Sequence, residues 1–171
     1  MAVRPIVLYK TNEAALRCKS EPVSLGSKRT RQLISDLKHT LLHHPKAIGL
    51  AAPQIGVHQR VVVVCFGVGI RERPSPPIAI VNPTIVEADR ELLDYDGCLS
   101  IPGLYAETVR PHCMRLQGLD EHENPFEWTL EGIDAVVVHH EVDHLDGILF
   151  IDRVTLPNRY YSEDEAAAVR V

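Results

Sequence analysis

The sequence lacks several features that define membrane, secreted or nucleic-acid-binding proteins. No apolar run reaches the length of a transmembrane helix, and residues 1–6 carry no apolar segment typical of a secretory signal. An excess of basic residues is also absent, since 18 Lys and Arg face 23 Asp and Glu and the net charge is −5. We therefore expect a cytoplasmic protein with neither DNA nor membrane as a partner, and an organellar origin stays open if a transit peptide is missing from the sequence.

Cysteine is scarce as well. The four cysteines, Cys18, Cys65, Cys98 and Cys113, are spread through the chain without the spacing of a disulfide framework, which agrees with a reducing compartment. Internal repeats and low-complexity segments are missing, and 171 residues with 45% hydrophobic content suit one globular domain. We predict a single domain over 1–171, whose polar end, 158–171, is an exposed tail.

Apolar periodicity predicts more strands than helices. A short helical piece is expected near 12–17, and a longer amphipathic helix over 28–44, capped by Ser24 or Ser27 and stopped by Pro45. Runs rich in valine and isoleucine predict short strands at 60–66, 78–81, 84–86, 112–119 and 126–130. Many short strands with few helices indicate an α+β fold, with mixed or antiparallel sheets packed around one central helix.

The central helix is predicted from the segment that contains His140, Glu141 and His144. Residues four apart lie on one face of an α-helix, so two imidazoles can bind one metal ion with Glu141 beside them as a general base. The apolar residues Ile133 and Val137 continue the same face upstream. The valine run before the motif also allows a buried strand, in which the two histidines would still share a face.

A catalytic metal site of this kind needs a third protein ligand and an open position for water. The metzincin pattern would require a histidine where the chain has Phe150. A thermolysin-like glutamate, Glu163 or Glu165, would have to come from a tail that is too short for a second helical subdomain. Cys98 is the better candidate, because Gly97 and a Ser-Ile-Pro-Gly turn flank it and can present its thiolate from a strand edge.

Three motifs, taken in this order, resemble those of the peptide deformylase family. The family motifs GxGxAAxQ, EGCxS and QHExDH correspond to Ala47–Gln54, Asp96–Ser100 and His139–His144. Segments similar to the family also flank the motifs, so that the resemblance covers the chain from about Ile6 to Arg153. Any one motif alone is weak, whereas three in order at compatible spacing are specific.

The resemblance implies a metal-dependent hydrolase that removes the N-formyl group from the initiator methionine of newly made polypeptides. Cys98, His140 and His144 would hold the metal, which is Fe²⁺ in most members, with Zn²⁺, Ni²⁺ or Co²⁺ as substitutes. Glu141 would be the general base and acid. A metalloprotease with a tail glutamate, and a non-catalytic module with a structural zinc site, are the alternatives from other classes.

The resemblance also implies donors for the oxyanion and a pocket for the methionine. Gln54 and the backbone N–H of Leu99 would stabilise the oxyanion. Arg110 would lie near the pocket mouth, with a solvated arginine on a strand edge as the alternative. The residues placed to line an apolar pocket are Ile48, Gly49, Ile133, Val136 and Val137, and plain core packing is the alternative for each.

Three motif positions depart from the family pattern. Ala47 replaces a glycine, which would strain the backbone if the position needs a positive φ, or would narrow the cleft. Asp96 is one methylene shorter than the family glutamate. His139 replaces a glutamine and can titrate near neutral pH, compete for the metal, or point away from it. We expect an intact metal site with an altered rate or an altered preference among N-formyl and N-acyl peptides.

The tail carries Glu163, Asp164 and Glu165 against Arg170. Acidic residues are repelled by RNA phosphates, whereas some bacterial members of the family carry a longer basic helix there. We therefore expect transient proximity to the ribosome, where nascent chains emerge, without strong binding through the tail.

Overall fold

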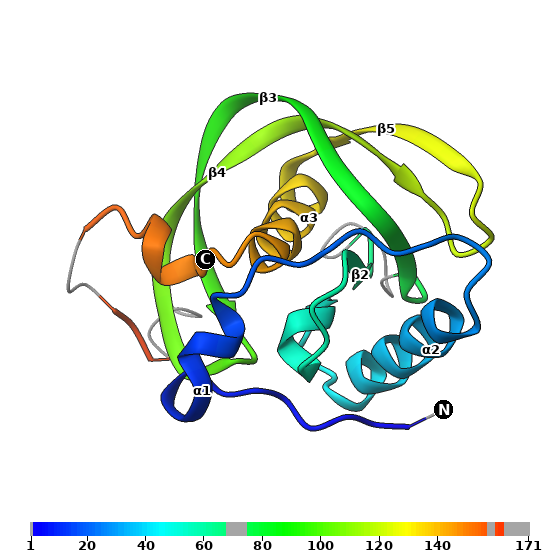
Figure 1. The fold of residues 1–171 in the computed structure, drawn as a ribbon. Coiled ribbons are helices and arrows are strands. Elements are labelled where there is room, and N and C mark those ends of the chain that lie inside the picture. Colours follow the sequence, from blue (N-terminus) through cyan, green and yellow to red (C-terminus); the bar gives the residue numbers. More distant parts are fainter. Residues whose placement is uncertain (1, 68–74, 157–159, 163–171) are drawn as a thin grey trace.

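One five-stranded antiparallel sheet organises the structure, a computed structural model that describes residues 2–67, 75–156 and 160–162 (Figure 1). The strands lie in the order β1-β2-β3-β4-β5, so neighbours in the sequence are neighbours in the sheet. The prediction of an α+β fold with antiparallel strands is confirmed. The elements are α1 (Tyr9–Leu16), α2 (Lys28–His43), β1 (Gly49–Ala51), η1 (Ala52–Ile55), β2 (Val61–Val64), β3 (Ile78–Cys98), β4 (Ile101–Leu119), β5 (Pro125–Glu131), α3 (Gly132–Leu145) and η2 (Phe150–Arg153).

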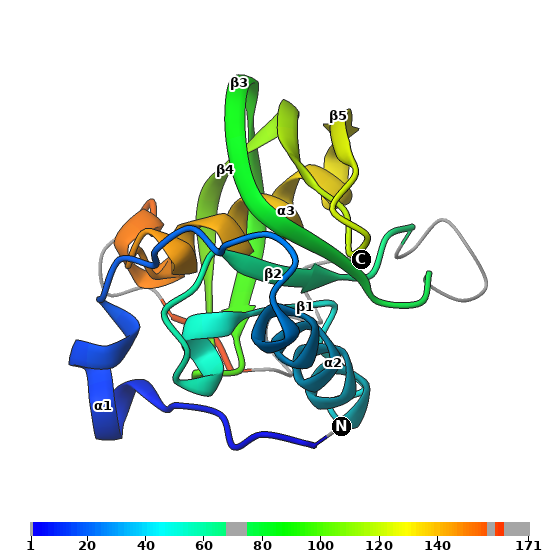
Figure 2. The same cartoon turned by 45° about the vertical axis from the view of Figure 1, so that its right-hand side comes forward.

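The sheet has a helix on each face at β2. The four valines of β2 are fully buried, because successive side chains point to opposite faces of a strand and both faces are covered. Val61 and Val63 pack in the cluster that contains the apolar residues of α2, and Val62 and Val64 pack in the cluster that contains those of α3. Figure 2 shows α2 and α3 on opposite sides of β2.

The helix α3 carries His140, Glu141 and His144 and is buried on almost all sides. The strands β3, β4 and β5 arch around it (Figure 1), so even its residues far from β2 are buried. A helix enclosed in this way carries apolar residues on several sides, which explains the run of valines before His139. The sequence analysis had also considered a buried strand for this run. The helix ends at Asp146, and Gly147 follows with a φ of 74°.

The other helices begin and end close to the predicted residues. Ser27 caps α2, because its Oγ accepts a hydrogen bond from the N–H of Arg29 at 3.2 Å. His44 ends the helix immediately before Pro45, as predicted. The helix α1 starts at Tyr9, three residues before the predicted start, and is kinked at Asn12, which has a φ of −155° and a ψ of 65°.

The strand predicted at 126–130 is confirmed as β5. The separate short strands predicted at 78–81 and 84–86 are wrong, because both lie in β3, and the strand predicted at 112–119 is the last part of the longer β4; β3 and β4 form one long hairpin. Asn82, with a φ of 49°, marks a shift of register rather than the end of a strand. Its side-chain amide bonds both backbone groups of Val23, at 2.9 and 3.1 Å. A second shift follows between Ile85 and Glu87, and a third, between Gly97 and Cys98, falls at the end of β3. Turn-forming residues therefore bend the strand without ending it.

The described part of the tail departs from the prediction at one position. Tyr160 and Ser162 are exposed, but Tyr161 is half-buried and forms an antiparallel bridge with Tyr105. The prediction of an exposed tail is therefore wrong at Tyr161. The other tail residues, 158–159 and 163–171, lie outside the described residues, and the charges on which the ribosome prediction rests lie among them.

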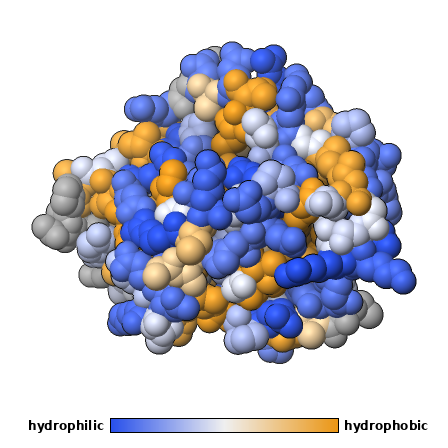
Figure 3. All heavy atoms as spheres, in the orientation of Figure 1, coloured by the Kyte–Doolittle hydropathy of each residue, from blue (hydrophilic) through white to orange (hydrophobic). Residues whose placement is uncertain are grey.

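The face shown in Figure 3 is mostly polar, and its apolar side chains form several separate patches. Within the described ranges, no helix is both long enough and apolar enough to cross a membrane.

Candidate active site

Three side chains that can bind a metal meet between the end of β3 and α3. The sulfur of Cys98 and one ring nitrogen each of His140 and His144 lie within 4.8 Å of one another. Cys98 Sγ is 3.2 Å from His144 Nε2. The structure thus brings together the three ligands that the sequence predicted, two of them from one helix and the third from a strand more than 40 residues earlier.

The donor set fits one tetrahedral ion. With metal–sulfur and metal–nitrogen bonds of about 2.3 and 2.0 Å, neighbouring donors of a tetrahedron lie about 3.5 Å apart. The distance of 3.2 Å between Cys98 Sγ and His144 Nε2 is close to that value. One thiolate and two imidazoles leave a fourth position, which catalytic sites keep for water. Across residues 2–67, 75–156 and 160–162, no fourth His, Cys, Asp or Glu belongs to the group.

Asp96 fixes the ring of His140. Its Oδ1 lies 2.8 Å from His140 Nδ1, and both side chains are buried. A carboxylate only accepts, so Nδ1 carries the proton and Nε2 is the nitrogen available to a metal. Burial would lower the pKa of His140, but the Asp96 carboxylate outweighs burial and raises that pKa above its usual value. A metal ion that binds Nε2 therefore displaces a proton.

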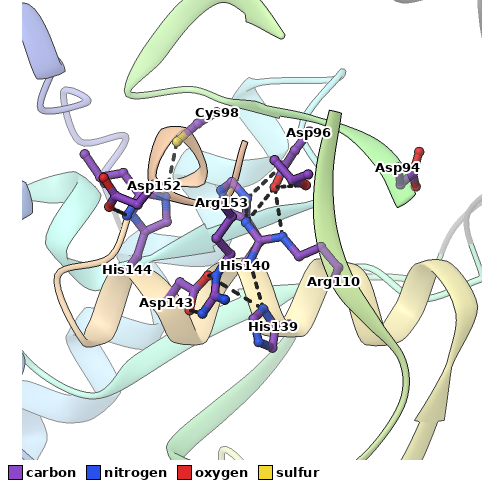
Figure 4. A network of polar contacts seen from close by, with 12 residues as sticks. Asp94, Asp96, Cys98, Arg110, His139, His140, Asp143, His144, Asp152 and Arg153 are labelled. Atoms are coloured by element: carbon purple, nitrogen blue, oxygen red, sulfur yellow. Dashed lines mark hydrogen bonds and ion pairs between the residues drawn. The ribbon is translucent and has the colours of Figure 1, made fainter. Parts of the chain in front are cut away.

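Arg110 lies at the centre of a buried ion network (Figure 4). Its Nε and Nη2 donate to Asp96 Oδ2 at 2.9 and 2.6 Å. Its Nη1 donates to Asp143 Oδ2 at 2.5 Å and to His139 Nδ1 at 2.8 Å. Arg153 adds two hydrogen bonds to Asp143, at 2.5 and 2.7 Å. The negative charges of the two carboxylates are thus balanced by the positive charges of the two guanidinium groups. Charged groups can be buried together only when they are paired in this way.

The position of Arg110 corrects the sequence analysis. Its side chain is 0% exposed and does not line the cleft, so it is neither an arginine at the pocket mouth nor a solvated one. The alternation of β4 turns this side chain toward α3, where the two carboxylates neutralise it. Asp143 is a residue of this network to which the sequence analysis gave no role. Its spacing of three residues from His140 and four from His139 puts it on the same face of the helix, and this spacing could have indicated a contact with them.

For two of the departures from the family pattern, the structure decides among the alternatives given above. His139 points away from the three candidate ligands toward Arg110 and is not part of their group. Burial, followed by the charges of Arg110 and Arg153, lowers the pKa of His139 to about 4 against the opposing effect of Asp143. Ala47 lines the cleft, but its φ is not positive, so the predicted backbone strain is absent.

Glu141 has a buried carboxylate at the floor of the cleft. Burial raises its pKa to about 7, and its Oε2 has no hydrogen-bond partner in the part of the chain that the structure describes. Gly49 makes room for this side chain, since a Cβ built at Gly49 would lie 2.8 Å from Glu141 Cδ. The carboxylate can therefore exchange a proton near neutral pH within the cleft.

Gln54 presents an oriented side-chain amide to the same cleft, next to Cys98. Its Oε1 accepts a hydrogen bond from the N–H of Ala51 at 2.8 Å, which fixes the oxygen side of the amide. Its Nε2 then lies 3.3 Å from Cys98 Sγ and 3.4 Å from Ser100 Oγ. Leu99 lies between these two residues in sequence, and its side chain packs against the core on the α2 side.

A cleft of about 400 Å³ opens beside these groups. Its lining includes all five residues predicted for the pocket, namely Ile48, Gly49, Ile133, Val136 and Val137, and it also includes Gln54, Cys98, Leu99, His140 and Glu141. The sequence analysis missed Asp94, Tyr95 and Tyr105, which also line the cleft. No local pattern marks them, because their place depends on how β3 and β4 pair. Figure 4 shows Asp94 apart from the ion network.

Comparisons with known proteins agree with this arrangement. The family model described as polypeptide deformylase matches residues 3–160. The chain is 41% identical over 156 residues to a peptide deformylase of Cellvibrio japonicus, a match that covers 91% of this chain and 88% of the relative.

Solved structures give the same result. The crystal structure of a peptide deformylase from Legionella pneumophila is 36% identical, has a TM-score of 0.77, and matches 99% of this chain and 92% of that one. A class I type b peptide deformylase from Acinetobacter baumannii with Met-Ala-Ser bound is 31% identical, has a TM-score of 0.80, and matches 90% of this chain and 100% of that one. The chain therefore belongs to the peptide deformylase family, the metal-dependent hydrolases that remove the formyl group from new polypeptides.

Proposed function

We propose that Cys98, His140 and His144 hold the divalent metal ion at which this chain removes the N-formyl group from the initiator methionine. The observation that carries the proposal is the convergence of these three donors within 4.8 Å, beside the buried carboxylate of Glu141 and the amide of Gln54. When bound, such an ion lowers the pKa of a coordinated water and polarises the formyl carbonyl. The side chains of the site then have to transfer the proton of the attacking water and stabilise the negative charge that develops on the formyl oxygen.

Glu141 is the proposed general base and acid. Its Oε2, which is buried and has no partner within the described residues, takes the proton of the attacking water and passes it to the amine nitrogen that leaves. A pKa near 7 allows the carboxylate both to accept and to return that proton at neutral pH.

Gln54 and the backbone N–H of Leu99 are the proposed donors to the oxyanion. The bond from the N–H of Ala51 holds the Gln54 amide in one orientation before any substrate arrives. A donor that is already oriented stabilises developing charge without the cost of reorganisation, and losing one typically raises the barrier by about 3 kcal/mol.

The apolar part of the cleft is the proposed methionine pocket. Ile133, Val136 and Val137 come from α3, one to two turns before His140, and Ile48 and Gly49 also line the cleft. The A. baumannii neighbour binds Met-Ala-Ser, the peptide that remains when formyl-Met-Ala-Ser loses its formyl group. We propose the same class of ligand for this cleft.

Ferrous iron is the proposed physiological metal, with zinc, nickel or cobalt as substitutes. A thiolate ligand donates more charge to the metal than a third imidazole and makes the site sensitive to oxidation. Protein purified without oxygen should therefore keep its activity longer than protein purified in air.

The two other classes of function have less support. A metalloprotease would draw its third ligand from Glu163 or Glu165, which lie outside the described residues, whereas Cys98 is already at the site. A structural zinc site would need a fourth protein ligand, and none joins the group within the described ranges. A changed preference among N-formyl and N-acyl peptides remains the alternative within the family. The single domain and the cytoplasmic location stay predictions.

The deciding experiment is hydrolysis of formyl-Met-Ala-Ser by protein loaded with Fe²⁺ or Ni²⁺ under anaerobic conditions. We expect turnover that Glu141→Ala reduces at least about 100-fold while one equivalent of metal stays bound. Cys98→Ala should abolish metal binding. A wild-type protein that holds stoichiometric metal and leaves the formyl group in place would refute the proposal.

The alternative within the family has its own test. The triple variant Ala47→Gly, Asp96→Glu, His139→Gln restores the family motifs, and its kcat/KM is compared with that of the wild type on formyl-Met, formyl-Leu and acetyl-Met peptides. Unchanged ratios among these substrates would show that the departures do not set substrate preference.

A further inference from the structure

Three tyrosines form a cluster at the edge of the cleft, and one of them belongs to the tail. We infer that Tyr161 is a positioning residue, which holds Tyr95 and Tyr105 as the outer wall of the cleft and so sets the affinity for the residues that follow the formylated methionine. The inference rests on the proposed function, because it concerns how the same cleft binds a longer peptide.

Backbone pairing fixes the tail segment to the wall. The N–H of Tyr105 donates to the carbonyl of Tyr161 at 2.9 Å, and the N–H of Tyr161 donates to the carbonyl of Tyr105 at 2.7 Å. This reciprocal pair is a closed antiparallel bridge on the edge of β4 that β3 leaves open. Before the tail, the N–H of Thr155 donates to the carbonyl of Glu107 at 3.2 Å, so the chain also contacts β4 shortly before the tail begins.

The tyrosine rings continue this contact to the cleft. The ring of Tyr161 meets that of Tyr95 edge to face, with 5.1 Å between the ring centres. Tyr105 pairs with Gly97 across the hairpin, and a Cβ at Gly97 would lie within 2.6 Å of the Tyr105 ring. The Tyr105 ring therefore lies flat against the backbone next to Cys98. Tyr95, Gly97 and Tyr105 all line the cleft, whereas Tyr161 stands behind them.

The position of the wall relative to the chemistry indicates what it contacts. The formyl carbon must lie near Cys98 and Glu141, and the methionine side chain fills the apolar side formed by α3. The peptide then continues along the other side of the cleft, which β3 and β4 supply through Tyr95 and Tyr105. Aromatic faces bind peptide planes and apolar or aromatic side chains, so this wall favours a polypeptide over a single formylated amino acid.

The test compares a substrate that reaches the wall with one that does not. Formyl-Met-Ala-Phe is the long substrate, and formyl-methionine amide is the short one. In Tyr161→Ala we expect KM for the long substrate to rise about threefold to tenfold, the range that the loss of one aromatic pair produces, with kcat unchanged. KM for the short substrate should stay at the wild-type value, and Tyr161→Phe, which keeps the ring contact, should restore KM for the long one.

Tyr160→Ala is the matched control, because Tyr160 is the neighbouring tyrosine but is 41% exposed. It should behave as the wild type. Equal KM changes for both substrates, or no change in Tyr161→Ala, would overturn the inference. Affinity for the product peptide Met-Ala-Phe is measured separately by calorimetry on metal-loaded protein. A wild type that binds this peptide without hydrolysing its formylated form contradicts the proposed function alone, and loss of that binding in Tyr161→Ala still supports the wall.

Discussion

Gly49→Ala is the substitution that the structure predicts most sharply. The added Cβ would lie 2.8 Å from Cδ and 2.9 Å from Cγ of Glu141, closer than real Cβ contacts. The strand cannot retreat easily, because Gly49 pairs with Val64 and the next residue, Leu50, is fully buried. The Glu141 side chain must therefore turn away from the reacting atoms, and the variant should resemble an enzyme without its general base.

The magnitude follows from the two effects of the clash. Displacing a general base costs about 10²- to 10⁴-fold in rate, and overpacking a buried site costs about 1–3 kcal/mol of stability. The assay is kcat on formyl-Met-Ala-Ser with metal content measured on the same sample, together with urea unfolding. We expect a loss of kcat of at least about 100-fold with one equivalent of metal still bound.

A double-mutant cycle shows whether the effect passes through Glu141. In the Glu141→Ala background there is no carboxylate to displace, so adding Gly49→Ala should change the residual rate and the unfolding free energy by less than about 0.5 kcal/mol. Additive effects in the cycle, or a Gly49→Ala enzyme with wild-type kcat, would refute the reasoning.

Three further predictions concern the groups around the ligands. Arg110→Met leaves Asp96 and Asp143 buried without a counter-charge between them, and should lower the free energy of unfolding at pH 7 by about 3–5 kcal/mol in urea titrations; a loss below about 1 kcal/mol would contradict the buried network. Gln54→Glu replaces an oriented donor by an acceptor, and should reduce kcat about 10²- to 10³-fold with metal content unchanged. Burial raises the pKa of Glu141 to about 7 and a bound cation lowers it, so kcat/KM should fall with acid through a midpoint at or below pH 7; the same midpoint in Glu141→Gln would assign it to another group.

The sequence by itself predicted the three candidate metal-binding residues, because two of them are related by local helical spacing. His140 and His144 are one helical turn apart, and the valines that precede them are the residues of a helix buried on all sides. Cys98 could be named because turn residues flank it and because three motifs occur in order. The apolar lining of the cleft was predicted in the same way, because Ile133, Val136 and Val137 lie on the helical turns before His140.

Only the tertiary structure decided what surrounds that centre. A register shift between Val81 and Thr84 lets β3 run past Asn82, where the local pattern of turn formers and short apolar runs had predicted separate strands. The pairing of β3 with β4 and the packing of α3 against β4 are contacts between distant residues, and together they placed Arg110 between Asp96 and Asp143. The same pairing put Tyr105 over Gly97 and gave the tail an edge to bind. The periodicity of a sequence shows to which side of its own helix or strand a side chain points. The charged group or aromatic ring that this side chain contacts belongs to another element, so the contact depends on how the elements pack in the fold.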